Sequence, residues 1–334
     1  LACVPCSTEV AEFARRYFFV RIWAAPATLC LMALKGWFIG MQDTVSPMAT
    51  DILVNVVNIV VSYRLAVYTP LGAVGVAYGT LIAQYSGGLL SVVIVTAKYR
   101  TILQGTAIWH RLTDFRSMRR LLVLNGNLFV RSICFMVVYV GFTALASRYG
   151  DTELAVSSIM MKLFMLFSYF IDGFAYAGEA LVGRFVGEKQ HAPLNNAIRI
   201  LFAWAIGIGG AFSLFYWMAG GECIGWLTDE VSVLSGIVPY MGWLIAMPVV
   251  SALAFMWDGI FVGAAAGKEI RNGMIFAATA FVFGYGLTCR WGGAQALYVG
   301  YFAHLVARVG YMTLKWKSVY DREIGKSQVE STQK

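Results

Sequence analysis

The chain has 334 residues, of which 59% are hydrophobic and only 13% are charged, and its net charge is +8. Because a soluble domain has about 25% charged residues, this composition excludes an ordinary soluble protein and is typical of an integral membrane protein. The main basic run, between residues 98 and 120, would also suit nucleic acid. Lys and Arg are, however, usually in excess in cytoplasmic loops, so we expect no nucleic-acid partner.

Nine segments of the chain are long and apolar enough to cross a membrane, for which about 20 residues are needed. Short breaks with turn or charged residues separate them, and only 98–120 is a long connection. The sequence therefore predicts an all-α integral membrane protein with three spans before this connection and six after it. In chain order the expected spans are 17–41, 48–68, 71–97, 121–147, 154–182, 197–218, 233–263, 271–289 and 293–315.

The distribution of Lys and Arg predicts the orientation of the chain. If 98–120 is cytoplasmic, the loops on its side carry 16 Lys and Arg, and the loops on the other side carry four. Positive residues favour the cytoplasmic side, so we expect the C-terminus to be cytoplasmic. Nine spans then place Leu1 outside the cell. Such a start, without a methionine or a signal peptide, indicates a fragment or a processed chain.

The first span and the seventh contain an internal repeat. Residues 22–40 (IWAAPATLCLMALKGWFIG) resemble 244–263 (LIAMPVVSALAFMWDGIFVG), so the first three spans look like the last three. This indicates two related halves, the first of which lacks its opening three spans. Duplicated helical halves are typical of transporters, whose substrate sites lie between the halves. Pro26 matches Pro248, and Phe38-Ile39-Gly40 matches Phe261-Val262-Gly263, with one residue inserted between.

The second span carries a polar stripe. Asp51, Asn55, Asn58 and Ser62 are spaced by four, three and four residues, which places them on one face of a helix. Such a stripe either joins helices through hydrogen bonds or lines a hydrated cavity. The spacing alone does not distinguish these two roles.

Four ionisable residues of the later spans are candidates for function. Because a helix rises about 1.5 Å per residue, Arg131 and Asp172 both lie about 15 Å from the cytoplasmic ends of consecutive antiparallel spans. A charge at this depth needs a partner or a wet cavity, so we expect the two to form an ion pair, either structural or one that changes during transport. Asp258, about 8 Å deep, suits proton uptake, and Glu179, about 5 Å deep, is expected at the interface.

The run 160–167 is rich in Met and Phe, which indicates either core packing or a deformable surface for apolar ligands. The loops show no nucleophile–base pair, metal cluster or phosphate loop, so we expect no enzyme. Cys3 and Cys6 form a C-x-x-C without a second pair, which disfavours a zinc or redox site.

Several motifs occur in a fixed order over residues 12–315. The most specific is Asp172-Gly173-Phe174-Ala175-Tyr176-Ala177-x-Glu179. The others are Gly36-Trp37-Phe38-Ile39-Gly40-Met41-Gln42, Asn55-x-x-Asn58-Ile59-Val60, and Trp257-Asp258-Gly259-Ile260-Phe261-Val262-Gly263-Ala264 with Arg271-Asn272. In these motifs the chain resembles the DinF-like branch of the multidrug and toxic compound extrusion (MATE) family.

The resemblance implies a twelve-helix transporter of two six-helix lobes, which exports organic cations or other amphipathic compounds in exchange for protons or sodium. It implies no cofactor other than the coupling ion. The expected partners are small drug-like molecules and membrane lipid, the expected state is a monomer, and the expected location is the bacterial inner membrane. In this chain 1–97 would be a partial N-lobe with family helices four to six, 98–120 the cytoplasmic loop between the lobes, 121–315 the C-lobe with helices seven to twelve, and 316–334 a cytoplasmic tail.

The resemblance also implies functional residues. Asp258 takes a C-lobe carboxylate position used for cation coupling, with Asp172, Arg131 and Glu179 as further coupling candidates, and Arg131 stands where other branches have an acidic residue. The candidates for lining the N-lobe cavity are Asp51, Asn55, Asn58 and Ser62. The family carboxylate of the first helix has no counterpart here, and Ser62 stands where the family commonly has an aspartate. Both departures disfavour an N-lobe cation site.

Two other functions remain open at this point. One is a flippase for lipid-linked precursors from the same superfamily, which the midplane Arg131 would suit. The other is a non-transporting membrane fragment or a structural partner, which the incomplete first half would suit.

Overall fold

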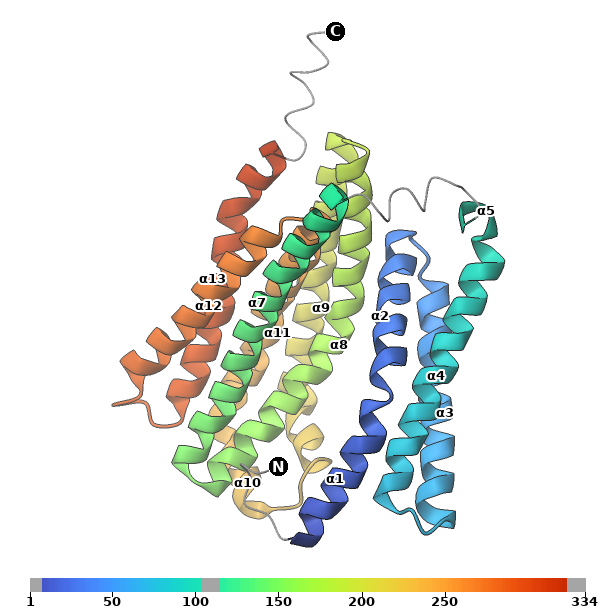
Figure 1. Cartoon of the computed structure of the whole chain (residues 1–334). Helices are drawn as coiled ribbons and strands as arrows, with labels where there is room; N and C mark the ends of the chain where they lie inside the picture. The colour runs from blue at the N-terminus through green and yellow to red at the C-terminus, as the bar shows by residue number, and fades with distance from the viewer. Residues whose placement is uncertain (1–7, 104–114, 323–334) are drawn as a thin grey trace. The chain divides into compact units, whose positions relative to one another are not determined.

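A computed structural model describes residues 8–103 and 115–322, and every regular element in these residues is a helix (Figure 1). The chain divides into two compact units, Leu1–Asp114 and Phe115–Lys334, and the boundary falls within the segment 98–120. The first unit contains α1 (Thr8–Ile22), α2 (Ala25–Gly40), α3 (Val45–Tyr68), α4 (Ala73–Lys98) and α5 (Arg100–Leu103). The second contains α7 (Phe115–Ala146), η1 (Ser147–Tyr149), α8 (Asp151–Gly187), α9 (His191–Gly225), α10 (Val231–Ile237), η2 (Val238–Tyr240), α11 (Met241–Gly263), α12 (Gly267–Thr288) and α13 (Gln295–Tyr320).

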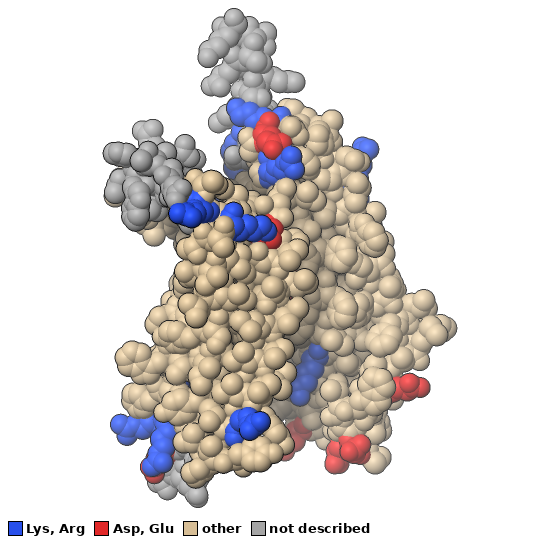
Figure 2. Space-filling model, turned by 90° about the vertical axis from the view of Figure 1, so that its right-hand side faces the viewer, with Lys and Arg blue, Asp and Glu red and all other residues tan. Residues whose placement is uncertain are grey.

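The helices lie where the apolar segments predicted them, which confirms an all-α membrane fold. Six stretches of the described residues are apolar and long enough to cross a membrane alone, and the bent pair α1–α2 makes a seventh. Helices α12 and α13 are long but less apolar, so the number of nine spans stays a prediction. On the face shown in Figure 2 the charged side chains gather mainly near the ends of the helices, and the band between them is almost uncharged. Cys3, Cys6, residues 104–114 of the long connection and residues 323–334 of the tail lie outside the described residues.

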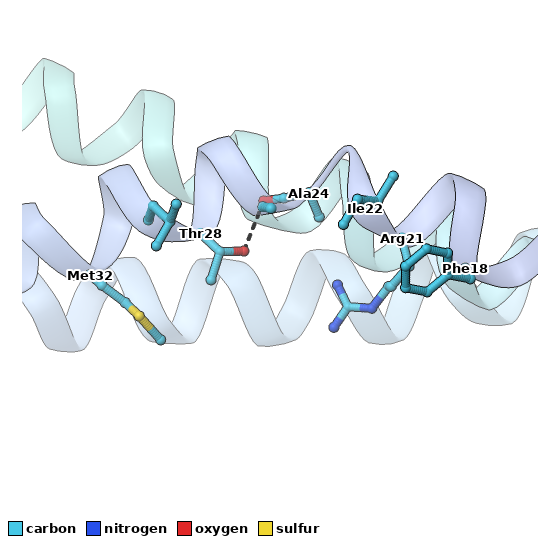
Figure 3. A pocket seen from close by; sticks show the side chains of 8 residues that line it. Phe18, Arg21, Ile22, Ala24, Thr28 and Met32 are labelled. Atoms are coloured by element: carbon cyan, nitrogen blue, oxygen red, sulfur yellow. Dashed lines mark hydrogen bonds between the residues drawn. The ribbon is translucent and has the colours of Figure 1, made fainter. Parts of the chain in front are cut away.

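The first predicted span is broken. Helices α1 and α2 meet at an angle of 46° across Trp23 and Ala24. Pro26 stands in the first turn of α2, where a backbone N–H would have no partner within the helix and is not missed. Because proline has no N–H to donate, the hydrogen-bond ladder of α1 cannot continue through it. Thr28 Oγ1 donates to the carbonyl oxygen of Ala24 at 2.9 Å and so satisfies one acceptor next to the break (Figure 3). The break leaves a shallow pocket of about 410 Å³, which Arg21 also lines.

The core of the second unit surrounds α11. In the most apolar stretch of α10–α11, 61% of the residues are buried, whereas in the most apolar stretch of α7 only 11% are buried. Helix α11 packs against α8, α9 and α13, whereas α7 packs mainly against α12. A charged group on α11 is therefore enclosed by the unit, and most of α7 is left uncovered by it.

The internal repeat reappears as a repeated turn. The amide of Asp43 donates to the carbonyl of Phe38 at 2.9 Å, and the amide of Ala266 donates to that of Phe261 at 2.9 Å. Between them Gln42 and Ala265 adopt the left-handed conformation, with φ of 59° and 53°. Both helices therefore end in the same way, with a residue of positive φ and this hydrogen bond across it. The two matched sequences thus form the same local structure.

Candidate functional site

Asp258 of α11 lies between two arginines from different helices. Arg308 of α13 donates from Nε to Oδ1 at 3.1 Å and from Nη2 to Oδ2, and Arg131 of α7 donates from Nη2 to Oδ2 at 2.6 Å. Only 5% of Asp258 and 2% of Arg308 is exposed. These three residues, which we call the charge cluster, join α7, α11 and α13.

The charge cluster has one carboxylate for two guanidinium groups. Buried charges are tolerated when they are paired and hydrogen-bonded, and here Arg308 alone already neutralises Asp258. Arg308 also lies over the ring of Phe255, with 5.8 Å between the guanidinium carbon and the ring centroid. Arg131 is the less enclosed arginine, with 32% of its side chain exposed, and its Nε has no hydrogen-bond partner among the described residues. The second positive charge therefore resides on Arg131, at the edge of the cluster.

The predicted ion pair between Arg131 and Asp172 is corrected by this geometry, because the ion pair of Arg131 is with Asp258. The predicted depths of Arg131 and Asp172 were counted from expected helix ends at 121 and 182. Helix α7 begins earlier, at Phe115, and α8 ends later, at Gly187, while α11 ends at Gly263. The helix ends are thus staggered, and equal counts from them do not identify partners across helices.

Asp172 nevertheless lies in the same cavity as the two arginines. A cavity of about 370 Å³ in the second unit is lined by Arg131, Asp172 and Arg308 together with aromatic, Met and Ser side chains. Both arginines act electrostatically on Asp172, which makes no direct ion pair with a described residue. Among the other lining residues are Phe164, Met161 and Met165 from the predicted Met- and Phe-rich run, and Tyr139, Tyr169 and Tyr301.

Two sequence motifs create this site by packing against each other. A β-carbon at Gly259 would collide with the carbonyl oxygen of Ala175, and one at Gly263 would lie 2.5 Å from that of Glu179. Only glycine at both positions lets α11 approach the backbone of α8 this closely. The motif that contains Asp258 is thereby pressed against the motif that contains Asp172.

Two further charged residues of the second unit, Glu179 and Arg308, lie near the predicted ion pair. Glu179 lies two turns from Asp172 on α8 and close enough to Arg131 to interact with it electrostatically. Arg308 was assigned no role from the sequence. An arginine near the middle of the last apolar span was nevertheless a signal, because an intramembrane charge has a functional or structural partner by default.

The polar stripe of α3 lies in the first unit. Asp51 forms an ion pair with Lys35 of α2, and their side chains are 51% and 28% exposed. Asn55 donates to the backbone carbonyl of Asp51 at 2.9 Å, and Ser62 donates to Asn58 at 2.7 Å. The stripe is thus bonded mainly within α3, and its role in lining a cavity stays a prediction.

A second buried carboxylate, Asp43, holds the α2–α3 turn of the first unit. It accepts hydrogen bonds from Lys98 Nζ at 2.7 Å, from Tyr99 OH at 2.9 Å and from Ser46 Oγ at 2.6 Å. Burial raises the pKa of Asp43, but these hydrogen bonds outweigh burial and hold the pKa below its usual value. We call this group the Asp43 latch; it joins the α2–α3 turn to the end of α4.

Comparison with known proteins connects these features to a family. The sequence matches the MatE family over residues 3–64 and 128–288. It is 32% identical over 320 residues to DNA damage-inducible protein F of Escherichia coli (strain K12), covering 95% of this chain and 69% of that protein. It is 25% identical to Protein DETOXIFICATION 43 of Arabidopsis thaliana, over 75% of this chain but only 46% of that protein.

The fold resembles solved structures as well. The crystal structure of MATE in complex with MaL6 matches with a TM-score of 0.85 and 18% identity, over 95% of this chain and 72% of that chain. The chain therefore shares the fold of these proteins along nearly all of its own length, and it spans about half the length of the plant relative.

Proposed function

The chain belongs to the MatE family, in its DinF-like branch, and from this premise we propose that it works in a secondary active efflux transporter. The family consists of transporters. The compounds exported would be organic cations or other amphipathic molecules, in exchange for protons or sodium. The observation that carries this proposal is the cavity of the second unit, in which apolar aromatic and Met side chains surround a small number of charged groups.

The cavity suits an amphipathic cation. Aromatic rings and Met side chains offer adaptable apolar contacts and attract positive charge to their faces. Asp172 adds a carboxylate that makes no direct ion pair with a described residue. A cation that enters the cavity would pair with Asp172, and a proton would compete with it for the same carboxylate. Exchange of the two at one site is the simplest form of antiport.

In this proposal Asp258 and Asp172 divide the coupling role. Asp258 accepts three hydrogen bonds from two arginines, so a proton that binds it must displace one of them. Arg131 is the more exposed of the two and is the group that proton binding would release. A released Arg131 would then move its charge towards Asp172 and Glu179 and expel a bound cation.

The flippase alternative finds less support. A lipid-linked precursor has a phosphate headgroup that needs free cations in the cavity. Asp258 is bonded to both arginines that line the cavity, and Asp172 lines it too, so two carboxylates balance the two arginines.

The proposal is tested by ligand binding and by transport. Purified protein should bind tetraphenylphosphonium, and Asp172→Asn should weaken this binding about tenfold or more, because a charged contact in a partly buried site is lost. The matched control is Asp151→Asn, an exposed carboxylate at the start of the same helix. In proteoliposomes, a pH gradient and a sodium gradient imposed separately identify the coupling ion. Equal affinity of Asp172→Asn and wild type would refute the assigned role of Asp172.

A further inference from the structure

A second hollow of the second unit lies between α7 and α12, which run side by side (Figure 1). Its volume is about 600 Å³, and small and aliphatic side chains form almost all of its wall. We call it the α7–α12 groove. It is separate from the cavity of the charge cluster, and it is lined by residues that include Val138, Gly141, Leu145, Ala278 and Val282.

The length of the α7–α12 groove matches one leaflet of a membrane. Its apolar part extends along α7 from Cys134 to Leu145, which is about 17 Å at the rise of a helix, and Arg148 follows in η1. One leaflet contributes about 15 Å of hydrocarbon, which is half of the core of a bilayer. An acyl chain lying in the groove would therefore cover its apolar length and end beside Arg148.

The end of the α7–α12 groove has the chemistry of a headgroup site. Arg148 is the one charged residue among the described residues that line it, it is exposed, and it makes no ion pair with a described residue. The neighbouring Tyr149 hydroxyl lies 3.2 Å from that of Tyr285 on α12. Trp291, which follows α12, is 92% exposed. A cation, tyrosine hydroxyls and an exposed Trp together are typical of the level of lipid headgroups.

We propose that the α7–α12 groove binds one phospholipid, with an acyl chain along the groove and the phosphate at Arg148. Two observations point to a lipid rather than to a further protein helix. The groove is apolar over the length of one leaflet, and the charge that the described residues place in its wall is a cation, positioned where a phosphate group would lie. An anionic phospholipid should bind more tightly than one with a neutral headgroup, since Arg148 offers an uncompensated positive charge.

Gly141 offers a way to fill the groove without disturbing the fold. A β-carbon there would have only one neighbour, an edge carbon of Phe281 at 3.9 Å, so a larger side chain would project into the hollow. Gly207 of α9 is the matched control, since it is exposed in the middle of another membrane helix and its β-carbon would meet nothing within 4 Å. Ala278→Phe fills the same groove from its other wall.

The test is native mass spectrometry of the delipidated protein with added phosphatidylglycerol. The wild type and Gly207→Leu should retain a bound lipid, and Gly141→Leu and Ala278→Phe should lower its affinity at least fivefold. Arg148→Gln should lower the affinity for phosphatidylglycerol about fivefold, the effect of one cation near an anionic headgroup, and should change that for phosphatidylcholine less. A photoreactive phospholipid should crosslink to residues 134–148 and 275–282.

Two results would overturn the proposal. Retention of phosphatidylglycerol by both groove-filling variants at wild-type affinity would place bound lipid elsewhere. Crosslinks that avoid both segments would show that the groove is covered, as by another protein helix.

Discussion

Helices α2 and α11 have matching sequences and end in the same turn, but their surroundings differ. Counted back from the shared Phe-x-Gly, Lys35 corresponds to Asp258 and Gly36 to Gly259. Asp258 is 5% exposed within the charge cluster, whereas Lys35 and its partner Asp51 are partly exposed. Gly259 contacts the backbone of α8, whereas a β-carbon at Gly36 would meet nothing within 4 Å.

A repeated sequence can therefore repeat the local structure without repeating the environment. In the second unit α8 covers the glycine face of α11, so the neighbouring charge is enclosed and needs two arginines as partners. In the first unit the equivalent glycine face is open within the described residues, and an ion pair of moderate exposure suffices. A charge at this position is therefore costly in the second unit, where it is buried, and is tolerated in the first unit, where it is partly exposed.

The largest contrast is expected between two carboxylates. Asp258→Asn leaves two guanidinium groups without a full counter-charge, one of them buried, and should lower the free energy of unfolding by about 3–5 kcal/mol. Asp51→Asn breaks a half-exposed pair and should lower it by about 0–1 kcal/mol. Unfolding in detergent, followed by circular dichroism, measures both. Replacing Arg308 by Met in the Asp258→Asn protein should recover part of the loss. Equal losses for the two single variants would contradict the difference in environment.

Replacing the two matched glycines by alanine should change the stability of the protein in opposite directions. Gly259→Ala forces α11 away from α8 and should destabilise the protein by about 1–3 kcal/mol. Gly36→Ala meets no neighbour and should stabilise α2 by about 0.5–1 kcal/mol, because Ala is the better helix former. The same unfolding measurement compares them. If Gly36→Ala is as damaging as Gly259→Ala, the α2 face is covered by another part of the protein.

The turns differ at one further position, where Asp43 stands in the first unit and Ala266 in the second. Asp43→Ala should destabilise the first unit by about 1 kcal/mol or more at neutral pH, because the start of α3 loses its cap, the hydrogen bonds from Ser46 to Asp43, and the Asp43 latch opens. The folded-state pKa of Asp43 lies below its unfolded value. This stabilisation is therefore present above about pH 4 and is lost as the pH falls through the folded-state pKa.

Thermal unfolding of Asp43→Ala and wild type between pH 7 and about pH 2 checks this prediction, because the gap is constant above the unfolded-state pKa and changes only below it. The gap between them should narrow as the pH falls. A gap that is independent of pH would show that the cap, and not the charge, makes the contribution. Ala266→Ser, at the matching position of the second unit, is the control and should show no such pH dependence.

The smallest change in stability is expected at the two left-handed residues, and it should be the same in both units. Gln42→Gly and Ala265→Gly relieve a left-handed conformation that costs a side chain about 1–2 kcal/mol, and the greater freedom of glycine in the unfolded chain offsets about half of this gain. Each variant should therefore raise the stability by less than about 1 kcal/mol. Similar melting temperatures for the two variants would support the shared turn. A gain at one position and a loss at the other would show that interactions of the replaced side chains, and not the turn alone, set the change in stability.

The sequence predicted those features that depend on neighbours along the chain. Apolar length and short polar breaks predicted where the helices lie, and Pro26 and Pro248 together with the Phe-x-Gly motifs predicted a repeat that the two turns show. The charges within the apolar segments of α7, α8 and α11 were also recognised, because an ionisable residue within an apolar segment is visible without any structure.

The partners of those charges depended on helix ends, tilts and rotations that a linear count does not contain. Arg131 was matched with Asp172 by depth, but its ion pair is with Asp258, and Arg308 closes the cluster from the last helix. The Asp43 latch likewise joins residues 55 positions apart, Asp43 and Lys98. Local sequence determined which segments are helices and where their charges lie, because helix formation and membrane insertion depend on nearby residues. Only the tertiary structure decided which charges meet, because the close packing of α8 on α11 sets the positions of side chains that are far apart in the sequence.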